Sequence, residues 1–285
     1  MSAVQDYDSG EFGTIRVVGR ACPLCGRDNG DVTPDRHSRD IWHLKHCRDC
    51  AFVYIDKAPD YAALFATMAW ERTSKAEERH RAEIRPISYR ASKWTRARMR
   101  ILPRKKIHLM VADHARPGNV IDLGCGDGGA MDELADEFTP YGVEISGELA
   151  HAANQRFAHR GGHAVNAPSI EGLKSFADGF FTAATLRSYL EHEMNPAGVL
   201  KALHRTLAPG GIAIIKVPNY ACWNRAVMGA RWCGFRFPDH LNYFTPRSLG
   251  AMAEKCGYSV RFGWTYKLPT SDNMYALLAK QDAKS

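Results

Sequence analysis

The sequence has no apolar run that approaches the ~20 residues needed to span a membrane. Its start, MSAVQDYDSGEFG, is polar and acidic and lacks the basic-then-apolar pattern of a secretory signal. Internal repeats and low-complexity tracts are also missing. We therefore expect a cytoplasmic protein without membrane association. Thiols stay reduced in that compartment, so paired cysteines indicate a metal site before a disulfide.

The 285 residues are 45% hydrophobic and 24% charged, as in globular proteins, and suit one domain plus a small module. The net charge of +7 is unevenly spread, because residues 71–116 hold fourteen Lys or Arg against five Asp or Glu. A solvated, helical connecting region is the favoured interpretation of this basic segment. A surface for RNA or for phosphorylated substrates is the alternative.

The pattern divides the chain into three parts. Residues 1–57 hold two cysteine pairs and short β-like runs, residues 58–117 are basic and helical, and residues 118–285 alternate strands with helices. In the last part we expect strands at 119–123, 141–145, 180–186 and 212–217, helices at 130–138, 147–158, 196–207 and 246–256, and a final hairpin of 258–266 with 274–280. This α/β alternation predicts a parallel sheet with helices on both faces.

Two Cys-x-x-Cys turns, separated by 21 residues, stand near the N-terminus. Such a pair presents four thiolates tetrahedrally, which suits a structural Zn²⁺ with no open coordination position. The predicted ligands are Cys22, Cys25, Cys47 and Cys50. The other four cysteines show no pairing pattern and are expected to be ordinary small apolar residues.

A glycine-rich turn, VIDLGCGDGG at 120–129, stands where a strand meets a predicted helix. Its G-x-G-x-x-G spacing alone would also fit a dinucleotide site. The same glycines read D-x-G-x-G-x-G from Asp122, and that acid can hold the cationic amino-acid end of S-adenosylmethionine. Glu144 stands 18 residues past Gly126, at the end of the next strand, where a carboxylate can accept hydrogen bonds from both ribose hydroxyls.

Residues 119–280 resemble the class I S-adenosylmethionine-dependent methyltransferases. VIDLGCGDGG matches the first motif of that family, YGVEIS its ribose-binding acid, FFTAATLRSYLEHEMNP its fourth strand and LHRTLAPGGIAIIKVPN its fifth. The resemblance implies a Rossmann-like, seven-stranded sheet whose last strand is antiparallel. It implies S-adenosylmethionine as cofactor, with candidate contacts from Asp122, Gly124, Cys125, Gly126, Gly128, Glu144, Ile145, Ser169, Ile170 and Leu186.

The sequence departs from the family in two places. Phe181-Thr182 stands where the family usually has Phe-Asp, and residues 166–171 are atypical where an adenine contact is expected. Ser169 and Ile170 are therefore only candidates for that contact.

The whole layout, with DHLNYFTPRSLGAMAEKCGY after the core, resembles zinc-ribbon methyltransferases of sugar and secondary-metabolite biosynthesis. That resemblance implies that Tyr189, Glu191 and His192 face the acceptor. His192 is the candidate general base and Glu191 could orient or polarise the site. The alternative is that His192 only lines the cofactor pocket. His240 and Tyr243 could close over the substrate, although core packing of Tyr243 is at least as well supported.

Two other functions stay open. Some rRNA base methyltransferases also join a zinc ribbon to this core, and the basic segment favours that alternative. The other is a cofactor-binding interaction protein that has lost activity, which the intact motifs argue against. A small-molecule acceptor is the expected partner and RNA the alternative. The acceptor's identity, the atom methylated and the oligomeric state do not follow from the sequence.

Overall fold

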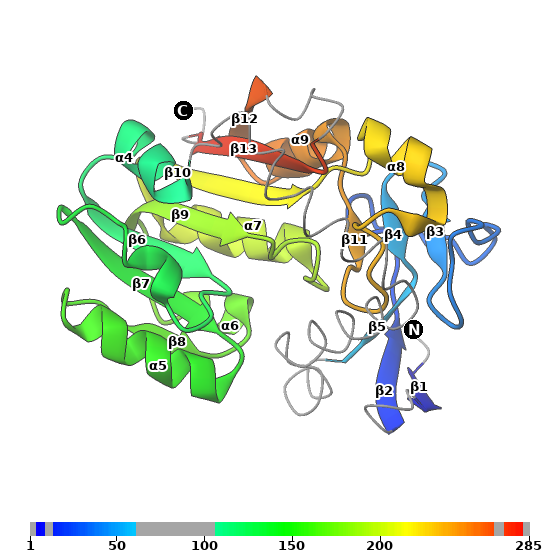
Figure 1. The fold of residues 1–285 in the computed structure, drawn as a ribbon, viewed down its shortest axis with the longest axis horizontal. Coiled ribbons are helices and arrows are strands. Elements are labelled where there is room, and N and C mark those ends of the chain that lie inside the picture. The colour runs from blue at the N-terminus through cyan, green and yellow to red at the C-terminus, as the bar shows by residue number, and fades with distance from the viewer. Residues whose placement is uncertain (1–3, 9–13, 61–105, 265–270, 282–285) are drawn as a thin grey trace, which may run out of the picture.

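The computed structural model describes residues 4–8, 14–60, 106–264 and 271–281. Its centre is a seven-stranded sheet in the order β8-β7-β6-β9-β10-β13-β12 (Figure 1). The strands are β6 (Gly118–Leu123), β7 (Phe138–Glu144), β8 (Ala164–Asn166), β9 (Phe181–Arg187), β10 (Leu207–Pro218), β12 (Tyr258–Phe262) and β13 (Asn273–Lys280). β13 lies antiparallel to both β10 and β12, whereas β8, β7, β6, β9 and β10 pair in parallel. The α/β sheet with an antiparallel last strand is therefore confirmed.

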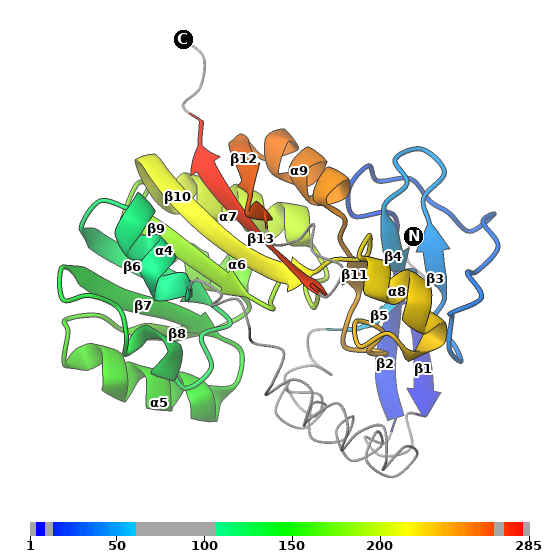
Figure 2. The same cartoon turned by 45° about the horizontal axis from the view of Figure 1, so that its top comes forward.

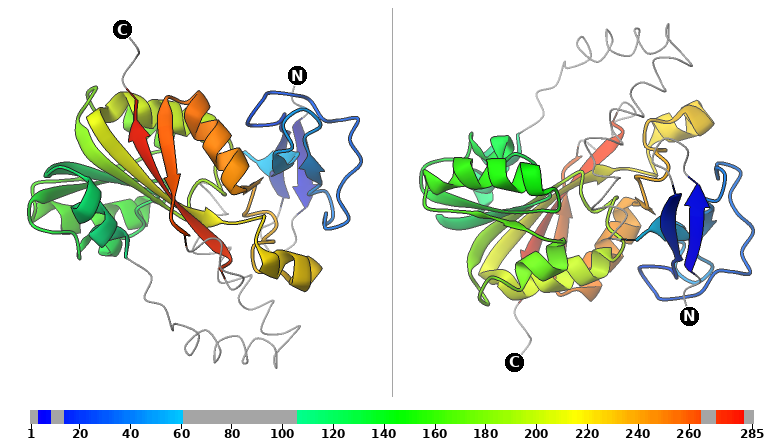
Figure 3. Two further views of the ribbon diagram at one scale, coloured as in Figure 1. Left: turned by 90° about the horizontal axis from the view of Figure 1, so that it is seen from above. Right: turned by 90° about the horizontal axis from the view of Figure 1, so that it is seen from below.

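Helices cover both faces of this sheet (Figure 3). On one face α4 (Ile107–His114) and α5 (Gly147–Ala158) share an apolar core with β6 and β10. On the other face α6 (Ser169–Leu173), α7 (Pro196–Thr206) and α9 (Pro246–Lys255) share the larger core with the same strands. The two layers leave the carboxyl ends of the parallel strands as the place for a ligand site.

The helix starts follow from capping residues. Ser146 accepts a hydrogen bond from the N–H of Leu149 at the start of α5, and Asn195 accepts one from Gly198 at the start of α7. Thr245 forms a capping box with Ser248 at the start of α9. The helices predicted at 147–158, 196–207 and 246–256 are confirmed, with ends shifted by one residue at most.

The helix predicted at 130–138 is wrong. Only a 3₁₀ turn, Gly129–Met131, follows the glycine loop, and β7 begins at Phe138. The residues expected to end the helix are used as sheet, because Phe138 pairs with Gly118 and Tyr141 with Ile121. Acidic residues at 136 and 137 would also have opposed the dipole at a helix C-terminus.

The N-terminal part forms two small antiparallel sheets. One consists of β1 (Val4–Asp8), β2 (Thr14–Gly19) and β5 (Lys57–Pro59). The other consists of β3 (Leu44–His46), β4 (Val53–Ile55) and β11 (Asn242–Tyr243), so a strand from far along the chain completes it. We call residues 14–60 the four-cysteine module. The predicted helical region at 58–117 lies largely outside the described residues. The structure describes residues 58–60, which include the end of β5, and residues 106–117, which contain α4.

The segment that supplies β11 runs from the end of β10 to the start of α9 and includes α8 (Trp223–Met228) and a 3₁₀ turn, Gly229–Arg231. It shares an apolar cluster with the four-cysteine module, in which Trp42 and Leu44 meet Tyr220, Trp232 and Phe235. The module therefore sits beyond the carboxyl end of β10 (Figure 2). Within the described residues, no helix combines the length and apolarity required to cross a bilayer.

Candidate functional site

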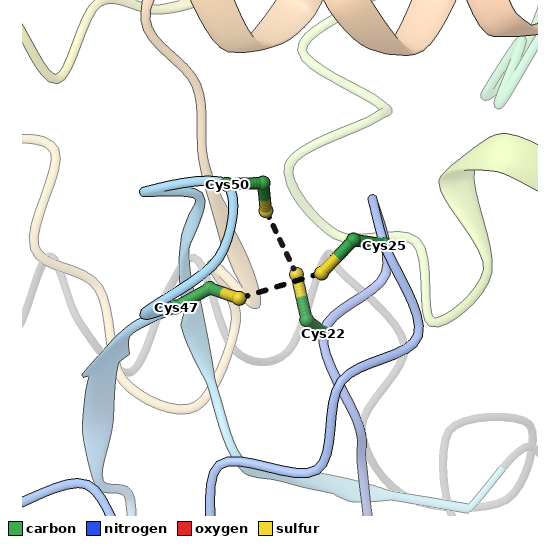
Figure 4. Close-up of side chains that lie close together, drawn as sticks. All are labelled: Cys22, Cys25, Cys47 and Cys50. Carbon is green, nitrogen blue, oxygen red and sulfur yellow. Dashed lines mark hydrogen bonds between the residues drawn. The ribbon is translucent and has the colours of Figure 1, made fainter.

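The four cysteines of the module converge from two separate turns (Figure 4). The Sγ atoms of Cys22 and Cys50 are 3.5 Å apart, those of Cys25 and Cys47 are 3.4 Å apart, and all four lie within 4.8 Å of one another. Four sulfurs around a zinc ion with ~2.3 Å bonds would be about 3.8 Å apart. The donor set and its spacing therefore fit the predicted structural zinc.

The two cysteine turns have the same backbone design. The N–H of Gly26 donates to the carbonyl of Cys22 at 2.8 Å, and the N–H of Ala51 donates to that of Cys47 at 2.9 Å. The residue after each pair is left-handed, with φ of +80° at Gly26 and +57° at Ala51. Burial opposes ionisation of Cys47, yet hydrogen bonds from the backbone of Cys50 and from other donors lower its pKa to about 6. Cys47 is therefore readily available as a thiolate ligand, whereas burial raises the pKa of Cys22 and raises that of Cys50 to about 11, so those two thiols would ionise on binding a cation.

The glycine loop joins β6 to the 3₁₀ turn at the carboxyl edge of the sheet. Gly124, Gly126 and Gly128 all have positive φ, at +69°, +57° and +80°. A Cβ at Gly124 would lie 2.7 Å from Tyr189 Cδ2, and one at Gly128 would lie 2.8 Å from a ring atom of Phe157. A Cβ at Gly126 would meet no heavy atom within 4 Å, so the backbone there faces open space that a ligand could fill.

Asp122, at the base of this loop, is buried and already has partners that the sequence did not predict. Thr185 Oγ1 donates to its Oδ1 at 2.5 Å, and Arg187 Nη2 lies 3.3 Å from its Oδ2. Burial raises the pKa of Asp122, while Arg187 and Thr185 act in the opposite direction. The predicted contact of Asp122 with the amino-acid end of the cofactor stays a prediction, and Arg187 would share that carboxylate.

Glu144 ends β7, next to the glycine loop. Its Oε2 accepts from the N–H of Gly126 and its Oε1 from the N–H of Ser146, both at 2.9 Å. These bonds fix the carboxylate beside the open space at Gly126. An acceptor held at this place suits the ribose hydroxyls of S-adenosylmethionine, so Gly126 and Glu144 together fit the predicted cofactor.

The loop after β9 brings the predicted catalytic residues to the glycine loop. The Tyr189 hydroxyl is 2.6 Å from Ser169 Oγ and 2.6 Å from Glu193 Oε2, while its ring lies against Gly124. The predicted adenine contact Ser169 is thus bonded to a predicted catalytic residue. Glu193, which the sequence analysis missed, has 5% of its surface exposed.

Glu191, His192 and His240 form a second cluster, with potential ligand atoms within 4.8 Å of one another. Glu191 is fully buried, and neither carboxylate oxygen has a hydrogen-bond partner among the described residues. Backbone carbonyls hold the two imidazoles, Asp239 O at 2.8 Å from His192 Nδ1 and Gly234 O at 2.8 Å from His240 Nδ1. The two rings meet edge to face at 4.8 Å. Imidazoles with a carboxylate are also a ligand set that divalent metals accept.

Burial sets the protonation states in this cluster. It raises the pKa of Glu191 to about 8, although Lys216 and Arg236 oppose the shift. Burial, with the positive charge of Arg236, lowers the pKa of His192 to about 4. His192 is therefore neutral at pH 7, and its bond to the Asp239 carbonyl requires the proton on Nδ1. The lone pair of the ring is then on Nε2.

The remaining predicted residues lie at different depths. Cys125 and Leu186 are buried in the two cores, and Ile145 and Ile170 are half-buried beside the ends of β7 and β8. Tyr243 is 3% exposed and packs on aromatic rings of the cluster around the module. Burial raises its pKa well above the usual value, and its hydroxyl has no hydrogen-bond partner among the described residues. The core packing considered for Tyr243 is what the structure shows, and the cofactor contacts of the others stay predictions.

Comparison with known proteins identifies the class. A family model described as "Methyltransferase domain" matches residues 89–261, more than half of the chain. The chain therefore belongs to this methyltransferase family, and together with its glycine loop this makes it an S-adenosylmethionine-dependent methyltransferase.

Curated relatives carry a more specific name. A ubiquinone biosynthesis O-methyltransferase of Pseudomonas aeruginosa is 30% identical over 158 residues, which are 52% of this chain and 68% of the relative. The enzyme of the same name from Xanthomonas axonopodis pv. citri is 25% identical over 203 residues, 65% of this chain and 83% of the relative. Among solved structures, YcgJ of Bacillus subtilis aligns over 62% of this chain and 99% of its own, with 14% identity and a TM-score of 0.49.

Proposed function

We propose that this enzyme methylates a small-molecule acceptor, at a hydroxyl oxygen or an acidified carbon, and that Tyr189, Glu191 and His192 face that acceptor. S-adenosylmethionine supplies, when bound, a methyl group on a sulfonium cation. Glu144 and the backbone at Gly126 would hold it from the first two strands. The observation that carries the proposal is the Glu191–His192–His240 cluster, in which Glu191 and His192 lie on the loop whose Tyr189 ring lies against the glycine loop.

His192 is the residue that would take the acceptor's proton. A general base must be unprotonated before the reaction, and the low pKa of His192, about 4, meets this condition at neutral pH, while it also makes the imidazole a weaker base than a histidine that titrates near neutrality. The Asp239 carbonyl at 2.8 Å holds the Nδ1 proton, so Nε2 is the atom that receives the second proton. Because burial raises the pKa of Glu191 to about 8, this carboxyl group is mostly protonated at neutral pH and would lie beside the imidazolium as a neutral polar group.

Burial favours a small acceptor over RNA. Glu191 is 0% exposed and His240 5%, while His192 is half-buried, so a base inside a folded RNA would have to be extruded to reach this cluster. The curated relatives are named as O-methyltransferases of ubiquinone biosynthesis, which supports a hydroxyl as the acceptor group without naming the molecule. The basic segment that favours RNA lies mostly outside the described residues.

We further propose that Cys22, Cys25, Cys47 and Cys50 hold one structural zinc ion. The complete four-sulfur set leaves no open position, so this metal would stabilise the module without taking part in methyl transfer.

The experiment supplies S-adenosylmethionine labelled in the methyl group, together with a small-molecule extract in one tube and total RNA in another. The proposal expects label in the small-molecule fraction only. Label in RNA, with salt-sensitive binding, would establish the rRNA alternative instead. Cofactor binding without transfer to either pool would identify an inactive, cofactor-binding protein.

A further inference from the structure

Arg20 lies between the end of β2 and the first cysteine turn, and its side chain leaves the module. Its backbone N–H donates to the Asp56 carbonyl at 2.7 Å, which ties the residue into the module. The guanidinium then joins residue 55 of the module to residues far along the chain. Nη1 donates to the carbonyls of Ile55 at 3.0 Å and Leu241 at 3.3 Å, and Nη2 to the Met194 carbonyl at 3.0 Å and Asn242 Oδ1 at 2.9 Å.

Asn242 continues this network into the loop that carries the proposed catalytic residues. It is 2% exposed on β11, opposite Tyr54 of the module. Its Nδ2 donates to the Leu190 carbonyl at 2.9 Å and to the Glu193 carbonyl at 2.6 Å. The backbone N–H groups of residues 241 and 242 both donate to the Glu191 carbonyl, at 2.7 and 3.0 Å.

Four carbonyls of one short loop, at positions 190, 191, 193 and 194, are thus bound by β11 or by Arg20. Those carbonyls flank Glu191 and His192, whose side chains point into the buried cluster. Asn242 Oδ1 accepts from Arg20, so its amide group is turned with both Nδ2 protons toward the loop. The guanidinium therefore sets the orientation of the amide that holds the loop.

We infer that Arg20 and Asn242 are positioning residues for the loop at 190–194, and that through them the four-cysteine module is part of the catalytic machinery. Arginine is needed at position 20 because one planar fork reaches four acceptors, which a lysine ammonium cannot do. Arg20 lies two positions before Cys22, so loss of the metal would release the guanidinium as well. A displacement of about 1 Å at a reacting group can lower a rate about 10²-fold.

The test compares Arg20→Lys and Asn242→Asp with a matched control, Arg16→Lys, an exposed arginine on β2 of the same module. Hydrogen exchange followed by mass spectrometry measures the exchange rates of backbone amides in the loop at 189–195 and, for comparison, in the glycine loop at 120–128. Both test variants, and wild type stripped of metal by a chelator, should exchange about tenfold faster at 189–195 and normally at 120–128. The control should match wild type at both places.

The kinetic part of the inference rests on the proposed function and uses the labelled acceptor fraction. In Arg20→Lys and Asn242→Asp, kcat should fall about 10- to 100-fold while the Kd for S-adenosylmethionine stays within about twofold, with bound zinc unchanged in both. Unchanged exchange at 189–195 would overturn the inference, as would equal loosening of both loops or an unaltered kcat. If wild type transfers no methyl group, the proposed function fails, and the exchange data alone then decide whether the module holds the loop.

Discussion

At the scale of single residues, Gly126 makes the cofactor site testable. Gly126 has a φ of +57°, and a Cβ there would meet no heavy atom within 4 Å. Gly161, in the turn after α5, has a φ of +76°, and a Cβ there would also meet no heavy atom within 4 Å. Gly126→Ala and Gly161→Ala should therefore carry similar backbone strain, about 1 kcal/mol. Only Gly126→Ala should also weaken S-adenosylmethionine binding, by about tenfold or more. Calorimetry that gives both variants the wild-type affinity would contradict the placement of the cofactor.

Glu191 makes a prediction about stability and pH. Its pKa is raised to about 8 from 4.5, so the folded chain keeps a proton that the unfolded chain releases above pH 4.5. The free energy of unfolding therefore falls as the pH rises through this window. Glu191→Gln lacks the effect. Between pH 6.5 and 8 the variant should gain roughly 1.5 kcal/mol on wild type, because the slope of about 1.4 kcal/mol per pH unit falls to half as the pH reaches the folded pKa of Glu191.

The range from pH 6.5 to 8 separates Glu191 from its neighbour. The lowered pKa of His192, about 4, makes stability rise with pH only up to about 6.5, where the unfolded imidazole also becomes neutral. Urea unfolding at the two pH values measures the difference. Glu148→Gln, an exposed carboxylate on α5, is the matched control and should track wild type. A constant gap between Glu191→Gln and wild type would show that Glu191 is ionised in the folded protein.

At the scale of elements, the four-cysteine module should depend on its metal. Cys47→Ser should abolish bound zinc, because three thiolates and a hydroxyl form a poor structural site, and residues 14–60 should then lose protection from proteolysis before the sheet does. Metal analysis with digestion mapping measures both effects. Cys233→Ser, outside the cluster, should keep the zinc and the wild-type digestion pattern. Full zinc content in Cys47→Ser would remove the four-cysteine site from the account.

Local signals made most of the regular elements predictable. Ser146 and Thr245 cap helices whose apolar periodicity is clear, and both helices lie where the sequence predicts them. The segment at 130–138 failed because an apolar spacing typical of a helix competes with pairing to β6, which no local pattern records. β11 is two residues long and pairs with β4 across about 190 positions, so neither periodicity nor turn residues could indicate it.

The residues of the site that belong to motifs were predictable from the sequence, and their partners were not. Motif spacing indicated Asp122, the glycines and Glu144, and the carboxyl edge of the sheet collects them as expected. The partners that fix them come from elsewhere in the chain, such as Arg187 on Asp122. No sequence pattern indicated the role of Arg20. An arginine beside a cysteine turn is expected to be a surface charge, and its acceptors at 194, 241 and 242 are known only from the structure.

At the scale of the whole molecule, the seven-stranded sheet and the four-cysteine module lie next to each other at the carboxyl edge of the sheet. The sheet carries the glycine loop and Glu144 at the carboxyl ends of β6 and β7, and the four-cysteine module lies beyond the end of β10 (Figures 1 and 2). The loop after β9 stands between them, with its side chains toward the sheet's site and its carbonyls bound by β11 and Arg20. We therefore expect binding of the cofactor to depend on the sheet alone, and turnover to depend on the sheet and on the four-cysteine module.

The most direct measurement follows methyl transfer by wild type and His192→Ala side by side, on the labelled small-molecule fraction at saturating S-adenosylmethionine, with the Kd for the cofactor determined on both. We predict that the variant keeps the wild-type Kd while its turnover falls ~10²–10⁴-fold, the usual contribution of a general base. If binding and turnover fall together, His192 only lines the cofactor pocket. Turnover that barely changes, or label that appears in RNA, would contradict the proposed acceptor site.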